Sequence, residues 1–291
     1  MNPVVIDFYH AVSGTFSYLV FDPETRIGGI VDPVLDFDMA SGGVSYESAN
    51  QILAIVAEKD LHIEWVLETH AHADHLTSAQ YIKHKTGAKV AIGRGITKVQ
   101  ATFKGIYDLA ESFNVEGEQF DHCFDDGDKF TIGNLTVRVM ATPGHTNDSV
   151  TYIIGDAAFI GDTMFHPKVG TARCDFPGGD AATLYQSIQQ ILSLPENTRL
   201  FLCHDYPEEG REATCEVSIA EQKAQNIHVN DGCSEQDFIQ FRTSRDSQLA
   251  VPHLLYPSVQ VNIAAGHFPD AGANGTVYLK TPITFKKKGD Q

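Results

Sequence analysis

The stretch Thr69-His70-Ala71-His72-Ala73-Asp74-His75 places three imidazoles and one carboxylate between positions 70 and 75. It directly follows 63–67, an apolar run that is typical of a buried strand. A loop that leaves a strand can aim closely spaced imidazoles inward, whereas a helix cannot do so for residues two apart. Four fixed positions of this kind arise by chance in about two chains in a thousand of this length. The stretch therefore predicts a metal site.

Three further segments repeat the arrangement of a histidine or aspartate just after an apolar run. They contribute His145 after Thr142-Pro143-Gly144, Asp162 after Phe159-Ile160-Gly161, and His204 after Leu202-Cys203. One histidine after a strand is usually a surface or capping residue, but the joint occurrence predicts ligands gathered along one sheet edge. Imidazole and carboxylate together suit Zn(II), Fe(II) or Mn(II) rather than a soft metal.

Strand-like runs occupy both halves of the chain, with helical patterns between them. Two such halves predict two sheets packed face to face with helices outside, an α/β sandwich. The expected strands are 4–9, 16–21, 27–31, 63–67, 89–92, 129–140, 150–154, 157–160 and 199–203. The expected helices are 45–59, 75–85 and 184–194, and the segment 93–119 fits neither pattern.

The last part of the chain predicts an appendage. Helical patterns at 212–225 and 235–240 alternate there with Pro-rich loops. We therefore expect a catalytic core over 1–210 and a C-terminal helical and loop extension over 211–291, which packs on the core as one structural unit and contributes to the substrate site. The run Lys286-Lys287-Lys288 is predicted to be a solvated tail rather than a binding site.

Composition excludes several classes of partner. The formal net charge of the 291 residues is -17, which argues against binding to nucleic-acid phosphates and against attraction to an anionic membrane. The first residues lack the pattern of a signal peptide. Five scattered cysteines without a Cys-x-x-Cys pair favour a reducing compartment, so we expect a cytoplasmic protein. The sequence leaves a monomer and a homodimer as alternatives.

Taken together, the motif residues resemble those of the metallo-β-lactamase superfamily, over at least 3–210. The resemblance implies an αββα sandwich whose edge is lined by the motif residues, in agreement with the two β-rich halves. Two branches keep nearly the same set of seven. Similarity to glyoxalase II implies two zinc ions and hydrolysis of a hydroxyacylglutathione thioester. Similarity to the persulfide dioxygenases implies one Fe(II) per chain, held by His70, His145 and Asp162.

Three segments are more similar to the dioxygenase branch. Gly170-Thr171-Ala172-Arg173-Cys174-Asp175-Phe176 resembles its Gly-x-x-Arg-x-Asp-Phe, where glyoxalase II normally has Gly-Cys-Gly-Arg. Cys203-His204-Asp205-Tyr206 resembles its His-Asp-Tyr, against Gly-His-Glu-Tyr-Thr in the hydrolase, and 183–188 resembles a helix of the dioxygenases. The resemblance therefore favours oxidation of glutathione persulfide by O2 to sulfite and glutathione.

That resemblance also implies roles for the remaining motif residues. His72, Asp74, His75 and His204 would hold the liganding imidazoles in the right tautomer or form a vacant second metal site. Tyr206 and Arg173 would orient the substrate, although packing of Tyr206 and pairing of Arg173 with Asp175 are equal alternatives.

The contacts to the thiol carrier depart from the family pattern. Glutathione-dependent relatives tend to carry Arg or Lys in the helix after the His-Asp-Tyr segment, where this chain offers Lys223 and then His228. We expect one of these two residues to meet a glutathione carboxylate. Two alternatives to the dioxygenase stay open, namely the binuclear zinc hydrolase and a non-catalytic sensor of metal or persulfide.

Overall fold

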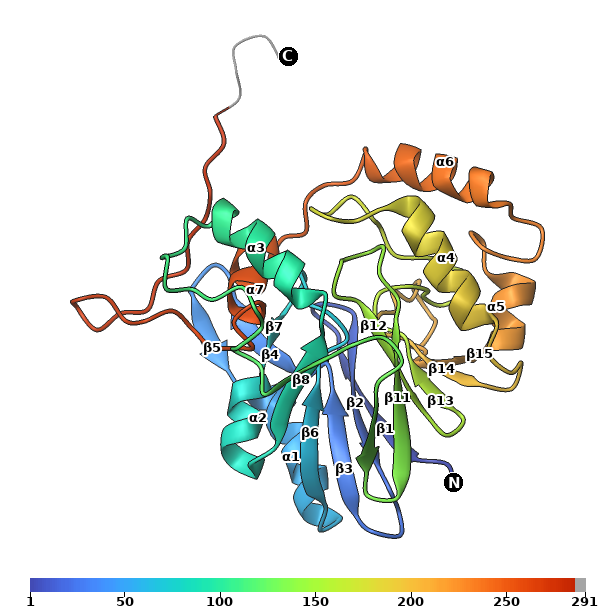
Figure 1. Cartoon of the computed structure of the whole chain (residues 1–291), viewed down its shortest axis with the longest axis horizontal. Helices are drawn as coiled ribbons and strands as arrows, with labels where there is room; N and C mark the ends of the chain where they lie inside the picture. Colours follow the sequence, from blue (N-terminus) through green and yellow to red (C-terminus); the bar gives the residue numbers. More distant parts are fainter. Residues whose placement is uncertain (286–291) are drawn as a thin grey trace.

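Two six-stranded β-sheets pack face to face in the computed structural model, which describes residues 1–285 (Figure 1). The first three strands of the first sheet are antiparallel, and each later strand in the sheet order runs parallel to its neighbour. In sheet order these strands are β1 (Val4–His10), β2 (Thr15–Phe21), β3 (Ile27–Val31), β6 (His62–Leu67), β8 (Lys89–Gly93) and β9 (His122–Phe124).

The second sheet is antiparallel except for one parallel pair, β13 with β14. Its strands follow the order of the chain. They are β10 (Lys129–Ile132), β11 (Leu135–Ala141), β12 (Val150–Ile154), β13 (Ala157–Phe159), β14 (Arg199–Phe201) and β15 (Glu216–Ser218).

Alternate residues of the strands fill the space between the two sheets. Along β2, Phe16, Tyr18 and Val20 belong to the core between the sheets. Leu19 points to the opposite face, where the outer helices pack. The ring of Tyr18 meets that of Phe159 edge-on at 5.3 Å, across the two sheets. Because side chains alternate along a strand, a strand covered on both faces is apolar throughout its length, and every residue of β2 is buried.

Helices cover the outer face of each sheet (Figure 1). On α4 (Ala181–Leu192), the residues Leu184, Ile188 and Ile191 recur at helical spacing and pack on the second sheet. The helices on the first sheet are α1 (Glu47–Glu58), α2 (Ala79–Thr86), α3 (Ile96–Ile106) and α7 (Leu255–Asn262). Those on the side of the second sheet are α4 (Ala181–Leu192), α5 (Ile219–Gln225) and α6 (Glu235–Asp246). The predicted αββα sandwich is confirmed.

Two helices begin four or more residues later than predicted. The helix expected from His75 begins at Ala79, because β7 (Leu76–Thr77) pairs with β4 (Val34–Asp38) in a small third sheet with β5 (Gly43–Ser45). The helix expected from Glu212 begins at Ile219, after β15. Ser218 caps it and forms a capping box with Glu221, which fixes that start.

Three further elements differ from the predictions in length or presence. The segment 93–119, which fits neither pattern, contains α3, and the Pro-rich loops contain α7. The helix expected to end at Gln240 continues to Asp246. The run Lys286–Lys288 lies outside the described residues.

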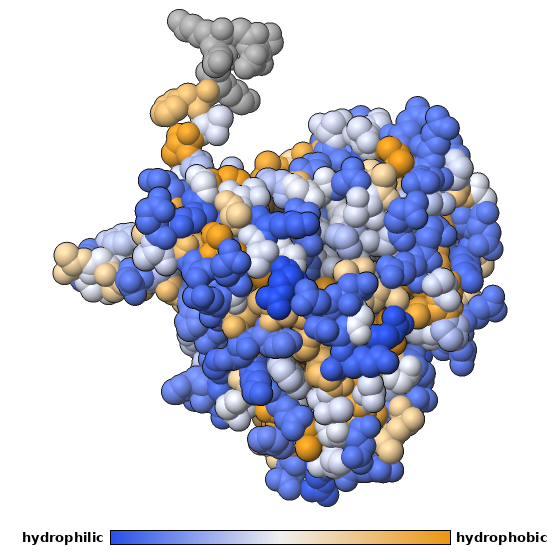
Figure 2. Space-filling view, in the orientation of Figure 1, coloured by the Kyte–Doolittle hydropathy of each residue, from blue (hydrophilic) through white to orange (hydrophobic). Residues whose placement is uncertain are grey.

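The surface is mainly hydrophilic on the face shown in Figure 2. An exception is the C-terminal segment that projects from the body, where Ile283 and Phe285 are exposed. Within residues 1–285, none of the helices is both long enough and apolar enough to cross a bilayer.

Candidate metal centre

Four strand ends bring the predicted ligands together. The loops after β6, β11, β13 and β14 carry His70, His145, Asp162 and His204, respectively. Asp162 Oδ2 lies 3.5 Å from His145 Nε2 and 3.9 Å from His70 Nε2, and Asp162 Oδ1 lies 3.3 Å from His204 Nε2. The expectation of a single sheet edge was wrong, because β6 belongs to the first sheet and the other three strands to the second. The ligands gather where the ends of both sheets meet.

The donor set fits a metal ion. One potential ligand atom each of His70, His145 and Asp162 lies within 4.8 Å of the others. His70 Nε2, His75 Nε2 and Asp162 Oδ1 are buried, and none has a hydrogen-bond partner among residues 1–285. Since buried polar atoms are normally hydrogen-bonded, this concentration of unsatisfied nitrogen and oxygen atoms indicates a cation. Imidazole with carboxylate is a ligand set for Zn(II), Fe(II) or Mn(II).

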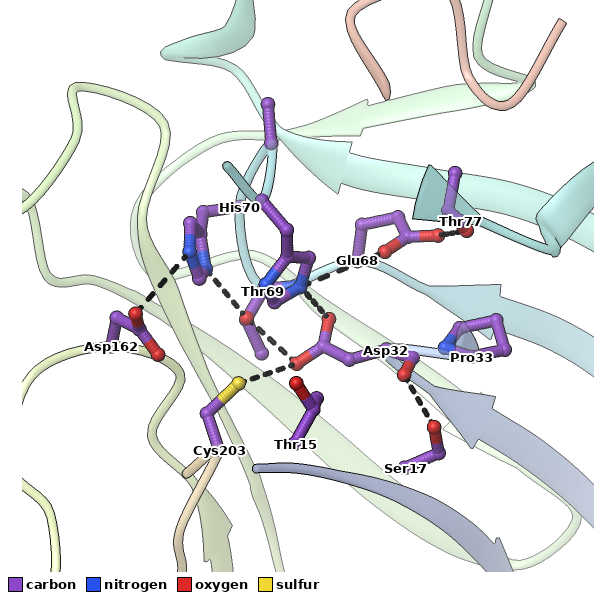
Figure 3. Close-up of polar contacts among 12 residues, drawn as sticks. Thr15, Ser17, Asp32, Pro33, Glu68, Thr69, His70, Thr77, Asp162 and Cys203 are labelled. Carbon is purple, nitrogen blue, oxygen red and sulfur yellow. Dashed lines mark hydrogen bonds and ion pairs between the residues drawn. The ribbon is translucent and has the colours of Figure 1, made fainter. Parts of the chain in front are cut away.

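Hydrogen bonds fix the tautomer of two of these imidazoles. His145 Nδ1 donates to the carbonyl oxygen of Arg173 at 2.6 Å, so Nε2 keeps its lone pair. The Thr69 hydroxyl donates to Asp32 Oδ2 at 2.8 Å and lies 3.0 Å from His70 Nδ1 (Figure 3). Because that hydroxyl proton is already used, His70 Nδ1 is the donor and its Nε2 is free to bind a metal.

Close packing against α4 shapes the loop that presents His145. Gly144 has φ +133°, and a Cβ at this position would lie 2.3 Å from Leu184 Cα. The carbonyl oxygen of Gly144 accepts from the backbone N–H of Asp180, and that of Pro143 accepts from the Ser187 hydroxyl. A glycine is therefore required immediately before this ligand.

A second group of donors lies beside the first. One potential ligand atom each of His72, Asp74 and His75 lies within 4.8 Å of the others. Asp74 Oδ2 is 3.1 Å from His75 Nδ1 and 3.6 Å from His204 Nε2. The motif residues thus form two adjacent clusters, and the donor types of the second would also suit a cation.

Asp32 organises this region and was missed in the sequence analysis. Its carboxylate accepts from the Thr69 backbone N–H at 2.7 Å and from the Thr69 hydroxyl (Figure 3). It also lies 3.1 Å from His72 Nε2. Its φ of +48° is unusual for a residue with a side chain. The signal was present in the sequence, since Asp32 follows an apolar strand as the ligands do.

Burial and neighbouring charges set the protonation of the site. Burial, reinforced by His72 and His145, holds the pKa of His70 well below its usual range. Burial is the largest influence on His72 and opposes its protonation. The charge and hydrogen bond of Asp32, together with the charges of Asp74 and Glu68, outweigh burial and raise the pKa of His72 to about 10. Burial beside Asp32 raises the pKa of Glu68 to about 8. His70 is therefore neutral at pH 7, the state that binds a metal.

A cavity of about 330 Å³ lies in front of these residues. Asp74, His145, Asp162 and His204 contribute to its lining. The ring of Tyr206 is stacked with that of His204 at 5.7 Å. The other lining residues are mostly apolar or cationic, and they include Phe165, Val169, Arg173, Phe176, His228, Arg242, Arg245, Leu249 and Pro252.

The structure brings three of the four predicted substrate contacts to this cavity. Arg173, Tyr206 and His228 line it, but Lys223 does not. Lys223 lines a separate cavity with Tyr185 of α4, because α5 turns this residue toward α4. The expectation that Lys223 meets the substrate beside the metal ligands is therefore not met.

His228 is placed at the cavity but is not a cation there. Its Nδ1 accepts the backbone N–H of Thr171 at 3.0 Å. Burial, with the positive charges of Arg242 and Arg245, lowers the pKa of His228 to about 4. The ring is therefore neutral at pH 7, so it does not offer a positive charge to the glutathione carboxylate that it was expected to meet.

Two arginines of α6 supply charge that the sequence analysis missed. Arg242 is buried and donates to the carbonyl oxygens of Thr171 and Ala172, and it pairs with Asp246. Arg245, three residues on, is exposed and has no ion-pair partner within the described part of the chain. Both were missed because the predicted helix stopped at Gln240.

Comparison with known proteins identifies the family. The model of the Metallo-beta-lactamase superfamily matches residues 11–204. The chain belongs to the metallo-beta-lactamase superfamily. It is 47% identical over 278 residues to a Dictyostelium discoideum protein named Glyoxylase B2, covering 95% of each chain. It is 30% identical over 209 residues to the human "Persulfide dioxygenase ETHE1, mitochondrial". That match covers 70% of this chain and 69% of the human protein.

A solved structure also resembles most of the fold. The crystal structure of ETHE1 from Myxococcus xanthus matches with a TM-score of 0.72 at 32% sequence identity. The match covers 91% of this chain and 100% of that one, so it includes part of the C-terminal extension.

Proposed function

We propose that this chain is a mononuclear non-haem iron dioxygenase that oxidises glutathione persulfide with O2 to sulfite and glutathione. The observation that carries the proposal is the contact between the dioxygenase-like segment and a ligand. The Arg173 carbonyl oxygen accepts from His145 Nδ1, and the Phe176 ring meets the His145 ring edge-on at 5.0 Å. The segment that distinguishes the two branches therefore touches the metal site itself. The likeness to the two proteins named ETHE1 supports the same choice.

The reaction is balanced by one water molecule. A persulfide RSSH, O2 and H2O give RSH and sulfurous acid, which ionises to sulfite; the sulfur loses four electrons, and O2 gains them. Fe(II), when bound by His70, His145 and Asp162, supplies the electron density that activates O2.

The residues around the ligands prepare the substrate. Apolar side chains, among them Phe165 and Phe176, limit the water that reaches the reacting sulfur. Desolvation at the cavity, reinforced by the charges of Asp162 and Asp74, raises the pKa of the half-exposed Tyr206, so its hydroxyl stays protonated at pH 7. In this state it can donate a hydrogen bond to an anionic persulfide at the mouth of the cavity.

The carrier is proposed to be anchored by Arg245. Glutathione has two carboxylates, and a chain of net charge -17 repels an anion unless a local cation attracts it. Arg173 is held by Asp175 through two hydrogen bonds of 2.6 and 2.7 Å, and Arg242 by Asp246. Of the three arginines that line the cavity, Arg245 is therefore the one whose charge is available to an anionic ligand.

A binuclear zinc hydrolase of hydroxyacylglutathione is the second candidate. The adjacent cluster of His72, Asp74 and His75 offers ligand atoms for a second ion. The relative named Glyoxylase B2 is also more similar in sequence than the human persulfide dioxygenase. In this alternative, the two clusters would hold two zinc ions, which would supply a nucleophilic hydroxide for hydrolysis of the thioester.

One assay separates the two candidates. The purified protein is loaded with Fe(II), given glutathione persulfide in an oxygen electrode, and assayed for sulfite. We expect O2 uptake with sulfite in equal amount, and one iron per chain by metal analysis. Rapid hydrolysis of lactoylglutathione without O2 uptake, with two zinc ions per chain, would establish the hydrolase instead.

A further inference from the structure

Asn262 connects the C-terminal extension to the loop that carries the metal motif. It stands at the end of α7, outside the residues 11–204 that match the family model. Its Nδ2 donates to the carbonyl oxygens of His72 and His75, both at 2.9 Å. Its Oδ1 accepts from the backbone N–H of Thr77 at 2.9 Å. The buried amide thus uses both of its donors and its acceptor on one loop.

These three bonds fix the shape of the motif loop. The carbonyls of His72 and His75 flank Asp74, so one planar amide sets the distance across the turn that carries this carboxylate. Without the amide, two carbonyl oxygens and one N–H would lose their partners inside the protein. Each such loss is costly, so the loop would change shape to satisfy them.

Helix α7 is itself firmly held, so Asn262 is a fixed anchor. Gln100 of α3 donates to the carbonyl oxygen of Ile263, and Gln80 of α2 donates to that of Ala265, both at 2.8 Å. Val259 and Ile263 are buried in the core between the first sheet and its helices. Rigid support of this kind keeps a metal site in its binding geometry.

We propose that Asn262 is a positioning residue of the metal centre, through which the C-terminal helix α7 controls how firmly the metal is held. Asn262 acts through the backbone of the motif loop, since its hydrogen bonds go to main-chain atoms. The inference depends on the metal site alone. It stands whichever of the two reactions the protein catalyses, and its test does not use either substrate.

The test compares Asn262→Ala with Gln260→Ala. Gln260 lies on the same helix, is also buried and also makes two hydrogen bonds, but it makes them to the backbone of Lys280. The metal-loaded proteins are mixed with excess chelator, and the rate of metal release is followed. Asn262→Ala should release metal about 10- to 100-fold faster than the wild type, the range typical of residues that support metal ligands. Gln260→Ala should release it at the wild-type rate.

A second variant tests the direction of the bonds. Asn262→Asp keeps the acceptor for Thr77 but replaces both donors by an oxygen that faces two carbonyls. It should release metal at least as fast as Asn262→Ala. Wild-type release from both Asn262 variants, or equally fast release from Gln260→Ala, would overturn the proposal.

Hydrogen exchange of the wild type tests the same coupling if the variants do not fold. A residue that ties α7 to the motif loop makes metal binding stabilise both, because coupling is reciprocal. Removal of the metal should accelerate amide exchange about tenfold in 70–77 and in 255–263, and leave α1 unchanged. Unchanged exchange in 255–263 would contradict the proposal.

Discussion

The floor and the outer wall of the cavity are built in different ways. We call the metal-ligand cluster of His70, His145 and Asp162, which lies behind the cavity, the floor. Each of its residues follows the end of a strand, and backbone or buried side-chain atoms hold the two imidazoles. On the wall, Arg242 and Arg245 come from one face of α6, three residues apart. Arg242 is buried and committed to Asp246, whereas Arg245 is exposed.

The comparison teaches that the two regions respond differently to change. Every ligand of the floor belongs to one network, so the loss of one member should affect the whole site. On the wall, the exposed Arg245 is proposed to contact the substrate by itself, so a change there should have a graded effect. The predictions below test this contrast, beginning with the floor.

Loss of a metal ligand should have the largest effect. His145→Ala and Asp162→Ala should each abolish bound metal and turnover, because a site of two imidazoles and one carboxylate does not survive the loss of one ligand. His204→Ala should keep much of the metal and lose only part of the rate. Metal content per chain and O2 uptake are the measurements, with His84→Ala on α2 as control. Equal metal loss in all three variants would indicate a binuclear site.

The next effect concerns the buried network that supports the ligands. Asp32→Ala should cost about 2–4 kcal/mol of unfolding free energy, since it removes a buried acceptor from Thr69 and the nearest carboxylate from His72. Asp22 is a matched control, because it is also buried and accepts three hydrogen bonds, from Glu24, Thr25 and Asn134.

Asp32→Ala and the control Asp22→Ala should both lower the denaturant concentration at the midpoint of unfolding. Only Asp32→Ala should lower the metal content per chain. Normal metal content in Asp32→Ala would show that the network around this residue stabilises the fold without supporting the metal site.

A smaller effect should appear in the pH dependence of stability. The folded pKa of His228 is about 4, below its ordinary value of about 6.5, so the unfolded chain binds the proton more readily. The stability from this residue is therefore complete above pH 6.5 and is lost as the pH falls to 4. Because solvent partly screens the ring, we expect the loss to be about 1–2 kcal/mol.

The measurement is the difference in unfolding free energy between the wild type and His228→Gln from pH 7.5 to 4. As the pH falls, the wild type should lose more unfolding free energy than His228→Gln does. A constant difference would mean that the ring titrates alike in the folded and unfolded chains.

The smallest effect is expected on the wall. Arg245→Ala should raise KM for glutathione persulfide about fivefold with little change in kcat, because an exposed ion pair contributes about 1 kcal/mol. Lys223→Ala is the control and should leave KM unchanged, since this residue lines another cavity. Steady-state O2 uptake gives both constants. A rise in KM with Lys223→Ala alone would assign the substrate contact to Lys223, one of the two residues predicted from the sequence.

The sequence by itself determined the floor of the site. Apolar runs marked the strands, and the His or Asp after each run marked the ligands, because the order of residues along a strand fixes what its end presents. The same rule would have found Asp32, which follows β3. The αββα layers also followed from local patterns, since apolar periodicity is a local property of the chain.

Only the tertiary structure decided the wall and the support of the motif loop. Nothing local to α5 indicates that Lys223 turns toward α4, and nothing local to α6 shows that Arg245 reaches the cavity. Asn262 lies 185 residues from Thr77, to which it is bonded. Contacts between residues so distant in the chain depend on how helices pack on sheets, and the packing is set by the whole core rather than by any one segment.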